Sequence, residues 1–315
     1  MNHLPRTALA AALLSVAAAA TTHAAIERRV EKAFVSQPGG TLQIETHAGN
    51  IEVVPSADMS VHVTAIERFR TDSNADADNL LQKLTLVIEQ DGTQVTATAR
   101  YEDGNPGFHF GSWPPVQVSF IIAAPSSYSA ELRTSGGNIS VAELRGHVRA
   151  HTSGGNVELG SIGGDVDAST SGGNLSLADG RGAVKMHTSG GGIALGRASG
   201  PVDVHTSGGN IRMESVENSV HASTSGGSIH ARIAGSIREE CSLRTSGGNV
   251  AVVLDPSAAY YLDAATSGGS VDAEGLTITI AKGGLRKSHL EGDVNGGGPL
   301  VRLSTSGGNI EIRTR

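Results

Sequence analysis

The chain has 315 residues, a formal net charge of −7 at pH 7, 42 glycines, one cysteine and only 3% aromatic residues. This modest acidic charge is spread along the chain and leaves no basic patch, which argues against a nucleic-acid partner. A single cysteine excludes an internal disulfide framework. The scarcity of large rings favours a stack of thin layers over an ordinary globular core.

Residues 1–24 have the features of a secretory signal peptide. Arg6 supplies a positive charge, residues 7–21 are mostly apolar, and Thr22-His23-Ala24 ends the segment with small residues at the positions that a signal peptidase reads. We expect cleavage after Ala24 and export to the periplasm or the cell surface. The apolar run is too short for a comfortable membrane span and no similar run follows, so no span is expected in the mature chain.

Residues 25–130 are predicted to form an irregular β-rich segment that caps one end of a longer repeat structure. Ser73, followed by Asn, Asp and then leucines, predicts one short helix within residues 73–84. Asp91-Gly92 is a favoured turn dipeptide between two alternating runs and predicts a β-hairpin. Alternation of apolar and polar residues predicts strands at 42–54, 61–66, 84–90, 94–100 and 116–123.

The stretch YEDGNPGFHFGSWPP is rich in glycine and proline and predicts an irregular loop. It gathers four of the few aromatic residues of the chain: Tyr101, Phe108, Phe110 and Trp113. Exposed rings on a rigid scaffold suit stacking on a glycan or contact with a protein partner. The alternative, which we favour, is that the loop folds back and plugs the end of the repeat structure with its rings as a core.

The phrase TSGG recurs through the rest of the chain. It begins at Thr134, Thr152, Thr170, Thr188, Thr206, Thr224, Thr245, Thr266 and Thr305. The intervals are 18 residues five times, then 21 twice, then 39. A period in this range is typical of a solenoid, and the final interval is expected to hold about two coils, one of which has lost the phrase.

Equivalent positions in the repeats agree chemically. The residues four and two before each threonine, and five and seven after it, are apolar in every copy, which is the alternation of strands with one buried face. Three before the threonine, the charges alternate in sign through Glu131, Arg149, Asp167, Lys185 and Asp203. Each charge would lie between opposite ones if successive coils stack in parallel about 4.8 Å apart. Residues 131–315 are therefore predicted to form an all-β parallel β-solenoid with coils of about 18 residues.

Two kinds of corner are expected in each coil. Ser-Gly-Gly marks the first, where glycine would supply backbone angles that other residues resist, and single glycines mark the second at Gly146, Gly164, Gly182 and Gly200. Turn asparagines are expected to stack as a ladder at Asn138, Asn156, Asn174, Asn210, Asn249 and Asn309. Arg313 and Arg315 are expected to place charge on the terminal strand and protect it from pairing with other chains.

The stretches GGTLQIETHAGNIEV, VSFIIAAP and DVNGGGPLVRLSTSGGNIEI, together with the TSGGNI coils, carry a family resemblance. At these residues the sequence resembles the bacterial putative-adhesin family of β-strand-repeat proteins, a domain family of unknown function. The resemblance covers about residues 35–313. It implies an exported β-solenoid with an adhesive or envelope role, and it brings no catalytic residues.

Candidate sites for chemistry are few. His187 and His205 occupy the same outward position in adjacent coils, so two imidazoles about 5 Å apart could hold a transition metal, although ordinary polar surface is the favoured reading. The turns lack the aspartates that calcium-binding repeats use. The five regular intervals leave no room for the long loops of a carbohydrate-cleaving β-helix. We expect no enzymatic activity, no cofactor and no metal.

The sequence therefore favours a non-enzymatic exported β-solenoid that acts as an adhesin or as a binding protein of the surface or envelope. An alternative is a periplasmic structural or accessory protein that binds another envelope protein. An ice-binding role ranks third, because regular threonine arrays can match a lattice, although these threonines share the inward parity of the core columns. The expected partner is an envelope protein or a surface glycan.

Overall fold

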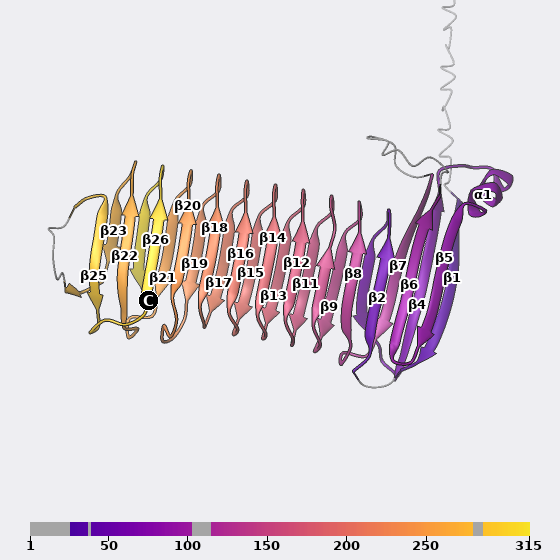
Figure 1. Ribbon diagram of the computed structural model, residues 1–315, viewed down its shortest axis with the longest axis horizontal. Coiled ribbons are helices and arrows are strands. Elements are labelled where there is room, and N and C mark those ends of the chain that lie inside the picture. Colours follow the sequence, from indigo (N-terminus) through magenta and orange to yellow (C-terminus); the bar gives the residue numbers. More distant parts are fainter. Residues whose placement is uncertain (1–25, 37–38, 103–114, 280–285) are drawn as a thin grey trace, which may run out of the picture.

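The computed structural model describes residues 26–36, 39–102, 115–279 and 286–315. The predicted signal peptide and three of the clustered aromatic residues, Phe108, Phe110 and Trp113, lie outside these ranges. Two long sheets of 13 and 14 strands run the length of a rod, with a small antiparallel extension and one helix at the N-terminal end (Figure 1). Within the described ranges, no helix is long and apolar enough to cross a membrane.

The 13-stranded sheet is called sheet A. In spatial order its strands are β1 (Ile26–Val35), β4 (Ser60–Phe69), β7 (Val116–Ala124), β3 (Ile51–Pro55), β9 (Ile139–Leu144), β11 (Val157–Ile162), β13 (Leu175–Gly180), β15 (Ile193–Ala198), β17 (Ile211–Val216), β19 (Ile229–Ile233), β21 (Val250–Leu254), β27 (Ile310–Thr314) and β23 (Val271–Glu274).

The 14-stranded sheet is called sheet B. Its spatial order is β24 (Ile278–Thr279), β25 (His289–Val294), β22 (Tyr260–Thr266), β26 (Leu300–Thr305), β20 (Cys241–Thr245), β18 (Val220–Thr224), β16 (Val202–Thr206), β14 (Val184–Thr188), β12 (Val166–Thr170), β10 (Val148–His151), β8 (Ser129–Thr134), β2 (Thr41–Thr46), β6 (Gln94–Tyr101) and β5 (Leu84–Asp91).

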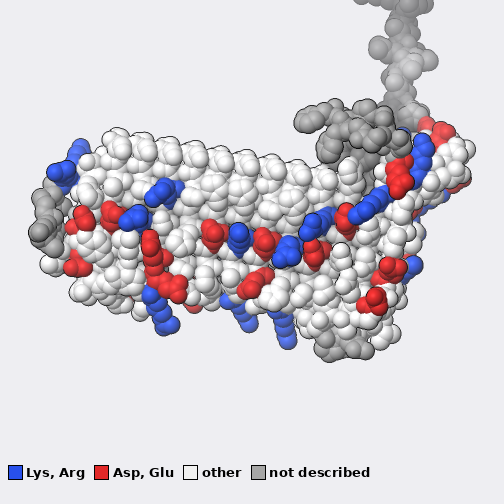
Figure 2. Space-filling view, viewed as in Figure 1, with Lys and Arg blue, Asp and Glu red and all other residues white. Residues whose placement is uncertain are grey.

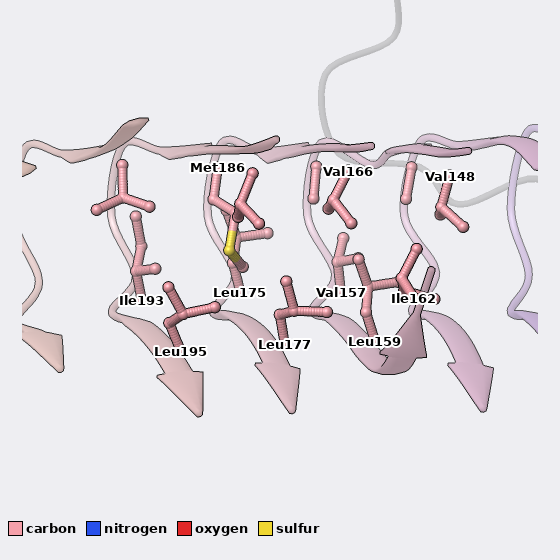
Figure 3. Packing of buried hydrophobic residues seen from close by; sticks show 14 of the residues in the cluster. Val148, Val157, Leu159, Ile162, Val166, Leu175, Leu177, Met186, Ile193 and Leu195 are labelled. Atoms are coloured by element: carbon pink, nitrogen blue, oxygen red, sulfur yellow. The ribbon is translucent and has the colours of Figure 1, made fainter. Parts of the chain in front are cut away.

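The predicted parallel β-solenoid is confirmed, and its register is the repeat interval. Val166 of β12 pairs with Val148 of β10 on one side and with Val184 of β14 on the other, all in parallel. The inward apolar columns of both sheets meet between them and are buried (Figure 3). Each fully buried aliphatic side chain contributes about 1.5–3 kcal/mol. Since every coil supplies the same columns, this apolar core runs through the whole stack.

The threonine of each TSGG phrase is buried, and its hydroxyl both donates and accepts a hydrogen bond inside the corner. The Thr170 hydroxyl donates to the carbonyl oxygen of Gly155 in the preceding coil at 2.8 Å and accepts from the backbone N–H of Gly173 at 3.3 Å. The other TSGG threonines make the same pair of contacts. The hydroxyls therefore stabilise the stack and are not presented as an outward array, which takes away the basis of an ice-binding face.

The reason expected for the corner glycines is wrong. None of the glycines with positive φ lies in a TSGG phrase. The second glycine is required by close approach instead: a Cβ on Gly173 would lie 1.9 Å from the carbonyl oxygen of Gly155 in the preceding coil. The first glycine has room, since the nearest atom to a Cβ on Gly172 would be 3.6 Å away. Coil stacking, rather than the local backbone angle, excludes side chains at the second position.

The predicted helix and hairpin are present in residues 73–101. Helix α1 (Asn74–Leu81) is capped by the Ser73 side chain, which accepts from the backbone N–H of Asp76 at 3.3 Å. Strands β5 and β6 form the hairpin, but its two central residues are Gly92 and Thr93, because Asp91 pairs with Gln94. Only Gly92, with φ of 56°, has positive φ there, which fits a type II′ turn.

At the N-terminal end, one coil lies out of sequence order. Strands β2 and β3 pair with β8 and β9 on one side and with β6 and β7 on the other, all in parallel. The later strands β6 and β7 therefore lie outside the earlier ones. Beyond them, β5 and β4 add antiparallel strands, and the charge-rich β1 forms the edge of sheet A. The division into domains at residue 130 stays a prediction, while the parallel stack continues across it.

The C-terminal end shows the same exchange. Strands β26 and β27 insert between β20 and β21 on one side and β22 and β23 on the other. The expectation of a second coil within the 39-residue interval is therefore wrong. Its described part holds β23 and β26, which continue the stack, and between them the short β24 and β25. Strand β25 runs antiparallel to both β22 and β24, so these two strands do not form another parallel coil. Arg313 lies in β27, between two neighbours, so it does not protect a terminal edge as expected.

Candidate functional site

The outer face of sheet B carries a row of alternating charges, here called the charge ladder: Glu131, Arg149, Asp167, Lys185 and Asp203. Each member is the register partner of the next, as the 18-residue interval predicts. Figure 2 shows basic and acidic side chains alternating in a row along the rod. The Arg149 Nε lies 3.7 Å from a carboxylate oxygen of Asp167, and both side chains are more than half exposed. Such pairs contribute little stability, so the ladder mainly sets the charge pattern of the surface.

Two residues further along the same strands lies a second outward row, here called the histidine column: His151, Ser169, His187, His205 and Ser223. His151 Nδ1 is 2.7 Å from the Ser169 hydroxyl, and His205 Nδ1 is 2.6 Å from the Ser223 hydroxyl. The rings of His187 and His205 are stacked, with centroids 5.1 Å apart and planes inclined by 7°. Across the described residues, no group of three or more His, Cys, Asp or Glu side chains is arranged to hold a metal ion.

The turn asparagines form a chain of hydrogen bonds from coil to coil. The Asn138 Oδ1 accepts from the backbone N–H of Asn156 at 2.8 Å, and Asn156 does the same for Asn174 at 2.7 Å. Where the next coil lacks asparagine, the bond is still made: the Oδ1 atoms of Asn174 and Asn210 accept from the backbone N–H groups of Gly192 and Ser228. Side-chain oxygens therefore satisfy backbone donors of the neighbouring coil.

The same chain of asparagine bonds follows the spatial order of the coils at the C-terminal end. Asn249 Oδ1 accepts from the backbone N–H of Asn309 at 2.8 Å, and Asn309 Oδ1 accepts from that of Ser270 at 3.0 Å. The bonds thus pass to a residue 60 positions later and then return to one 39 positions earlier. The corner chemistry is consequently the same for inserted and consecutive coils.

A recess of about 430 Å³ opens at the N-terminal end of this face, beside the out-of-order coil. It is called the junction recess. Strands β2, β6, β8 and β10 and the residues that follow them supply its lining, which includes Glu45, His47, Arg100, Tyr101, Glu102, Arg133, Ser135 and His151. Of the four aromatic residues predicted to bind a partner, the structure places Tyr101 in this lining.

The charges of the junction recess are balanced. Arg100 Nη2 donates to both carboxylate oxygens of Glu45, at 3.1 and 3.2 Å, and Arg133 Nη2 donates to Glu131 at 2.8 Å. With Glu102 also in the lining, the recess pairs cations with anions and adds hydroxyl, imidazole and phenol groups. This mixture suits a polar ligand of low net charge that can exchange hydrogen bonds and contact one aromatic ring.

The sequence did not point to the junction recess as a unit. Its arginines come from parts of the chain that become neighbours only because β2 lies between β6 and β8. One usable signal was present. The weak phrase THAGN aligns with TSGGN, which makes His47 and Ser135 equivalent positions of adjacent coils.

The single cysteine takes no part in this surface. Cys241 is buried in the inward column of β20. Burial raises the pKa of its thiol, and the nearby carboxylates of Glu240 and Glu239 act in the same direction. A thiol held protonated within an apolar column has the character of a small hydrophobic side chain.

The fold and this surface define a repeat architecture: a parallel β-solenoid with a regular polar face and specialised ends. The model of the Toastrack DUF4097 family matches residues 41–313. The chain belongs to this family of unknown function, so the resemblance noted in the sequence is confirmed at the level of the family. No curated protein matches the chain in sequence.

Several solved structures of bacterial proteins are similar to this chain over most of its length. A putative adhesin from Parabacteroides merdae has 12% identity and a TM-score of 0.46, with 91% of this chain and 96% of that chain covered. A putative lipid binding protein from Parabacteroides distasonis has 15% identity and a TM-score of 0.45, with the same shares covered. A putative adhesin from Bacteroides fragilis has 11% identity and a TM-score of 0.32, covering 91% and 97%.

Proposed function

We propose that this chain is a non-enzymatic, exported binding protein of the bacterial envelope or cell surface, with the adhesive role that its family resemblance implies. It binds through the outer face of sheet B, and the junction recess makes the principal contact. The observation that carries this proposal is the recess itself, where strands from separate parts of the chain bring two arginines, two imidazoles and Tyr101 around one concave surface.

The regular part of the face supports the same function in a different way. Its charge ladder and histidine column repeat at each coil, so an elongated partner meets a series of similar weak contacts. Contacts of this kind add through avidity rather than through one tight pocket. A surface glycan fits both features, because it is extended and rich in hydroxyl groups.

Binding of purified mature protein to immobilised envelope glycans tests the proposal, with Arg133→Ala as the decisive variant. Arg244→Ala is the matched control, because Arg244 occupies the equivalent outward position of β20, far from the recess, and bonds to Ser304 at 3.3 Å. We expect Arg133→Ala to weaken binding at least tenfold and Arg244→Ala to leave it within twofold. Equal effects of the two variants, or no effect of either, would remove the recess from the function.

Protease shaving and antibody labelling of intact cells, with a lysed control, address the compartment. Labelling of intact cells supports the adhesive form of the proposal. Labelling only after lysis supports the alternative, a periplasmic structural or accessory protein whose partner is another envelope protein. A chain recovered only in the cytoplasmic fraction would contradict export and both forms of the proposal.

A further inference from the structure

We propose that His187 and His205 form a two-imidazole binding site for a divalent transition-metal ion, with Zn²⁺, Ni²⁺ and Cu²⁺ as the chemical class. The two residues are register partners on the adjacent strands β14 and β16. Both side chains lie on the outward face, His187 exposed and His205 half-buried. Their rings are stacked and nearly parallel, with an angle of 7° between the planes and centroids 5.1 Å apart.

The hydrogen bond of His205 prepares its ring for a metal. The Nδ1 atom lies 2.6 Å from the hydroxyl of Ser223 on the next coil. When Nδ1–H donates to this hydroxyl, the lone pair of Nε2 is free to bind a metal, and the ring is held in one orientation. His187 has no hydrogen-bond or ion-pair partner among the described residues, so its ring is free to turn toward its neighbour.

A shared ion requires the two imidazole nitrogens to converge. Metal–nitrogen bonds to imidazole are about 2.0–2.1 Å, so two nitrogens on one ion lie at most about 4.2 Å apart. The ring centroids are 5.1 Å apart. Rotation of the exposed His187 side chain can therefore turn its Nε2 toward the Nε2 of His205, whose ring stays on Ser223. The backbone register between β14 and β16 does not need to change.

The chemistry of the donors selects the class of metal. Imidazole suits Zn²⁺, Cu²⁺ and Ni²⁺, whereas Mg²⁺ and Ca²⁺ require oxygen ligands. Lys185 and Asp203 precede the two histidines by two residues on the same face and pair with each other in register, so their charges largely cancel near the site. With two protein ligands, the remaining coordination positions are left to water or to a donor group of a bound partner.

His151 provides an internal control for this inference. Its Nδ1 makes the same kind of bond, 2.7 Å to the Ser169 hydroxyl. Its register neighbours are Arg133 and Ser169 rather than another histidine. His151 therefore has the supporting hydroxyl without the second imidazole, and a single exposed imidazole binds these ions only weakly.

Isothermal titration of the untagged mature chain with Ni²⁺ and with Zn²⁺ tests the site. We expect one ion per chain in the tightest binding class, with affinity reduced at least tenfold by His205→Gln and by His187→Gln. His151→Gln should leave the affinity within twofold, and Mg²⁺ should give no binding. Because the ion links two coils of the folded state, saturating Ni²⁺ should also raise the melting temperature of the parent chain but not of His205→Gln.

Either of two results would overturn the proposal. One is a tight class that persists in both His187→Gln and His205→Gln; the other is a loss in His151→Gln as large as in His205→Gln. Circular dichroism of each variant shows whether the solenoid is intact, and these outward positions are not expected to affect folding. The junction recess lies on other coils, so failure of the metal site leaves the proposed function untouched.

Discussion

The middle of the rod and its two ends are built from similar strands, but their cores are filled by different kinds of side chain. From β10 to β17, each coil repeats the register of the one before it. Residues 129–259 contain no Phe, Tyr or Trp, and the next aromatic residue is Tyr260, at the start of β22. The largest fully buried side chains are instead Tyr128, Tyr260, Phe69 and Phe120, which lie in or beside the exchanged coils. Thin layers of aliphatic residues suffice where a layer has a neighbour on both sides, whereas bulky rings fill the core where the stack stops.

Because of this difference, we expect substitutions in the middle of the rod and at its ends to affect stability in different ways. In the middle, every layer contacts only its two neighbours, so the contribution of one coil to the stability depends on that coil and on its interfaces with the coils on either side. At the ends, a coil is held by strands from distant parts of the chain. Three substitutions test the contrast, in order of decreasing effect.

Val184→Asp should have the largest effect, because it places a carboxylate in the inward column of a middle coil. Val184 is 2% exposed, and an unpaired buried charge costs on the order of 4 kcal/mol or more. Urea unfolding followed by circular dichroism should show a large fall in the midpoint. Lys185→Ala, one residue along on the exposed face, should change stability by less than about 0.5 kcal/mol. Similar midpoints for the two variants would contradict the assigned faces.

Gly173→Ala should be the next most damaging, by about 1–3 kcal/mol, because its Cβ would overlap the backbone of the preceding coil. Gly172→Ala is the matched control, since it adds the same methyl group where the nearest atom is 3.6 Å away. It should be neutral or slightly stabilising, because alanine lowers the entropy of the unfolded chain. Thermal unfolding of the pair distinguishes steric exclusion between coils from a general need for flexible turns, which predicts equal losses.

Tyr260→Phe should have the smallest effect, and only at alkaline pH. Burial raises the pKa of Tyr260 to about 12 from 10. The unfolded chain therefore loses this proton first, and stability declines as pH rises from 10 toward 12. Within the described residues the hydroxyl has no hydrogen-bond partner, so phenylalanine should cost nothing at pH 7.

Unfolding free energies measured from pH 7 to 11.5 provide the test at this end of the rod. Tyr260→Phe should retain up to about 2 kcal/mol that the parent chain loses at the upper limit. A loss of stability at pH 7 would show instead that the hydroxyl is bonded in the folded state. Parallel curves for the two proteins would show that Tyr260 ionises equally in both states.

The regular stack could be predicted from the sequence because each column repeats the same chemistry at a fixed interval. Val148, Val166 and Val184 are equivalent in composition and in space, and the stacked histidines follow from the same register. The order of coils at the ends could not be predicted in this way. Val301 of β26 and Leu262 of β22 are both apolar residues in the same column, so either coil satisfies β20 as a neighbour.

The junction recess was hidden for the same physical reason. A repeat specifies how coils pair, but it does not specify which coil is the neighbour, and Arg100 meets Glu45 only through an exchange of order. The corner glycines illustrate a second limit. Their presence marked the turns correctly, yet the contact that excludes a side chain at Gly173 comes from the coil beneath, which a local pattern does not describe.

The exchanged coils also constrain how such a molecule can change in length over evolution. A simple solenoid can gain or lose a repeat at its tip, but here each tip is held by a coil from elsewhere in the chain. Duplication or deletion of an 18-residue unit is therefore expected to be tolerated in the interior, between β10 and β17, where the register of successive coils is regular. Length can vary as a number of identical middle layers while both terminal assemblies, including the surface proposed to bind, are inherited intact.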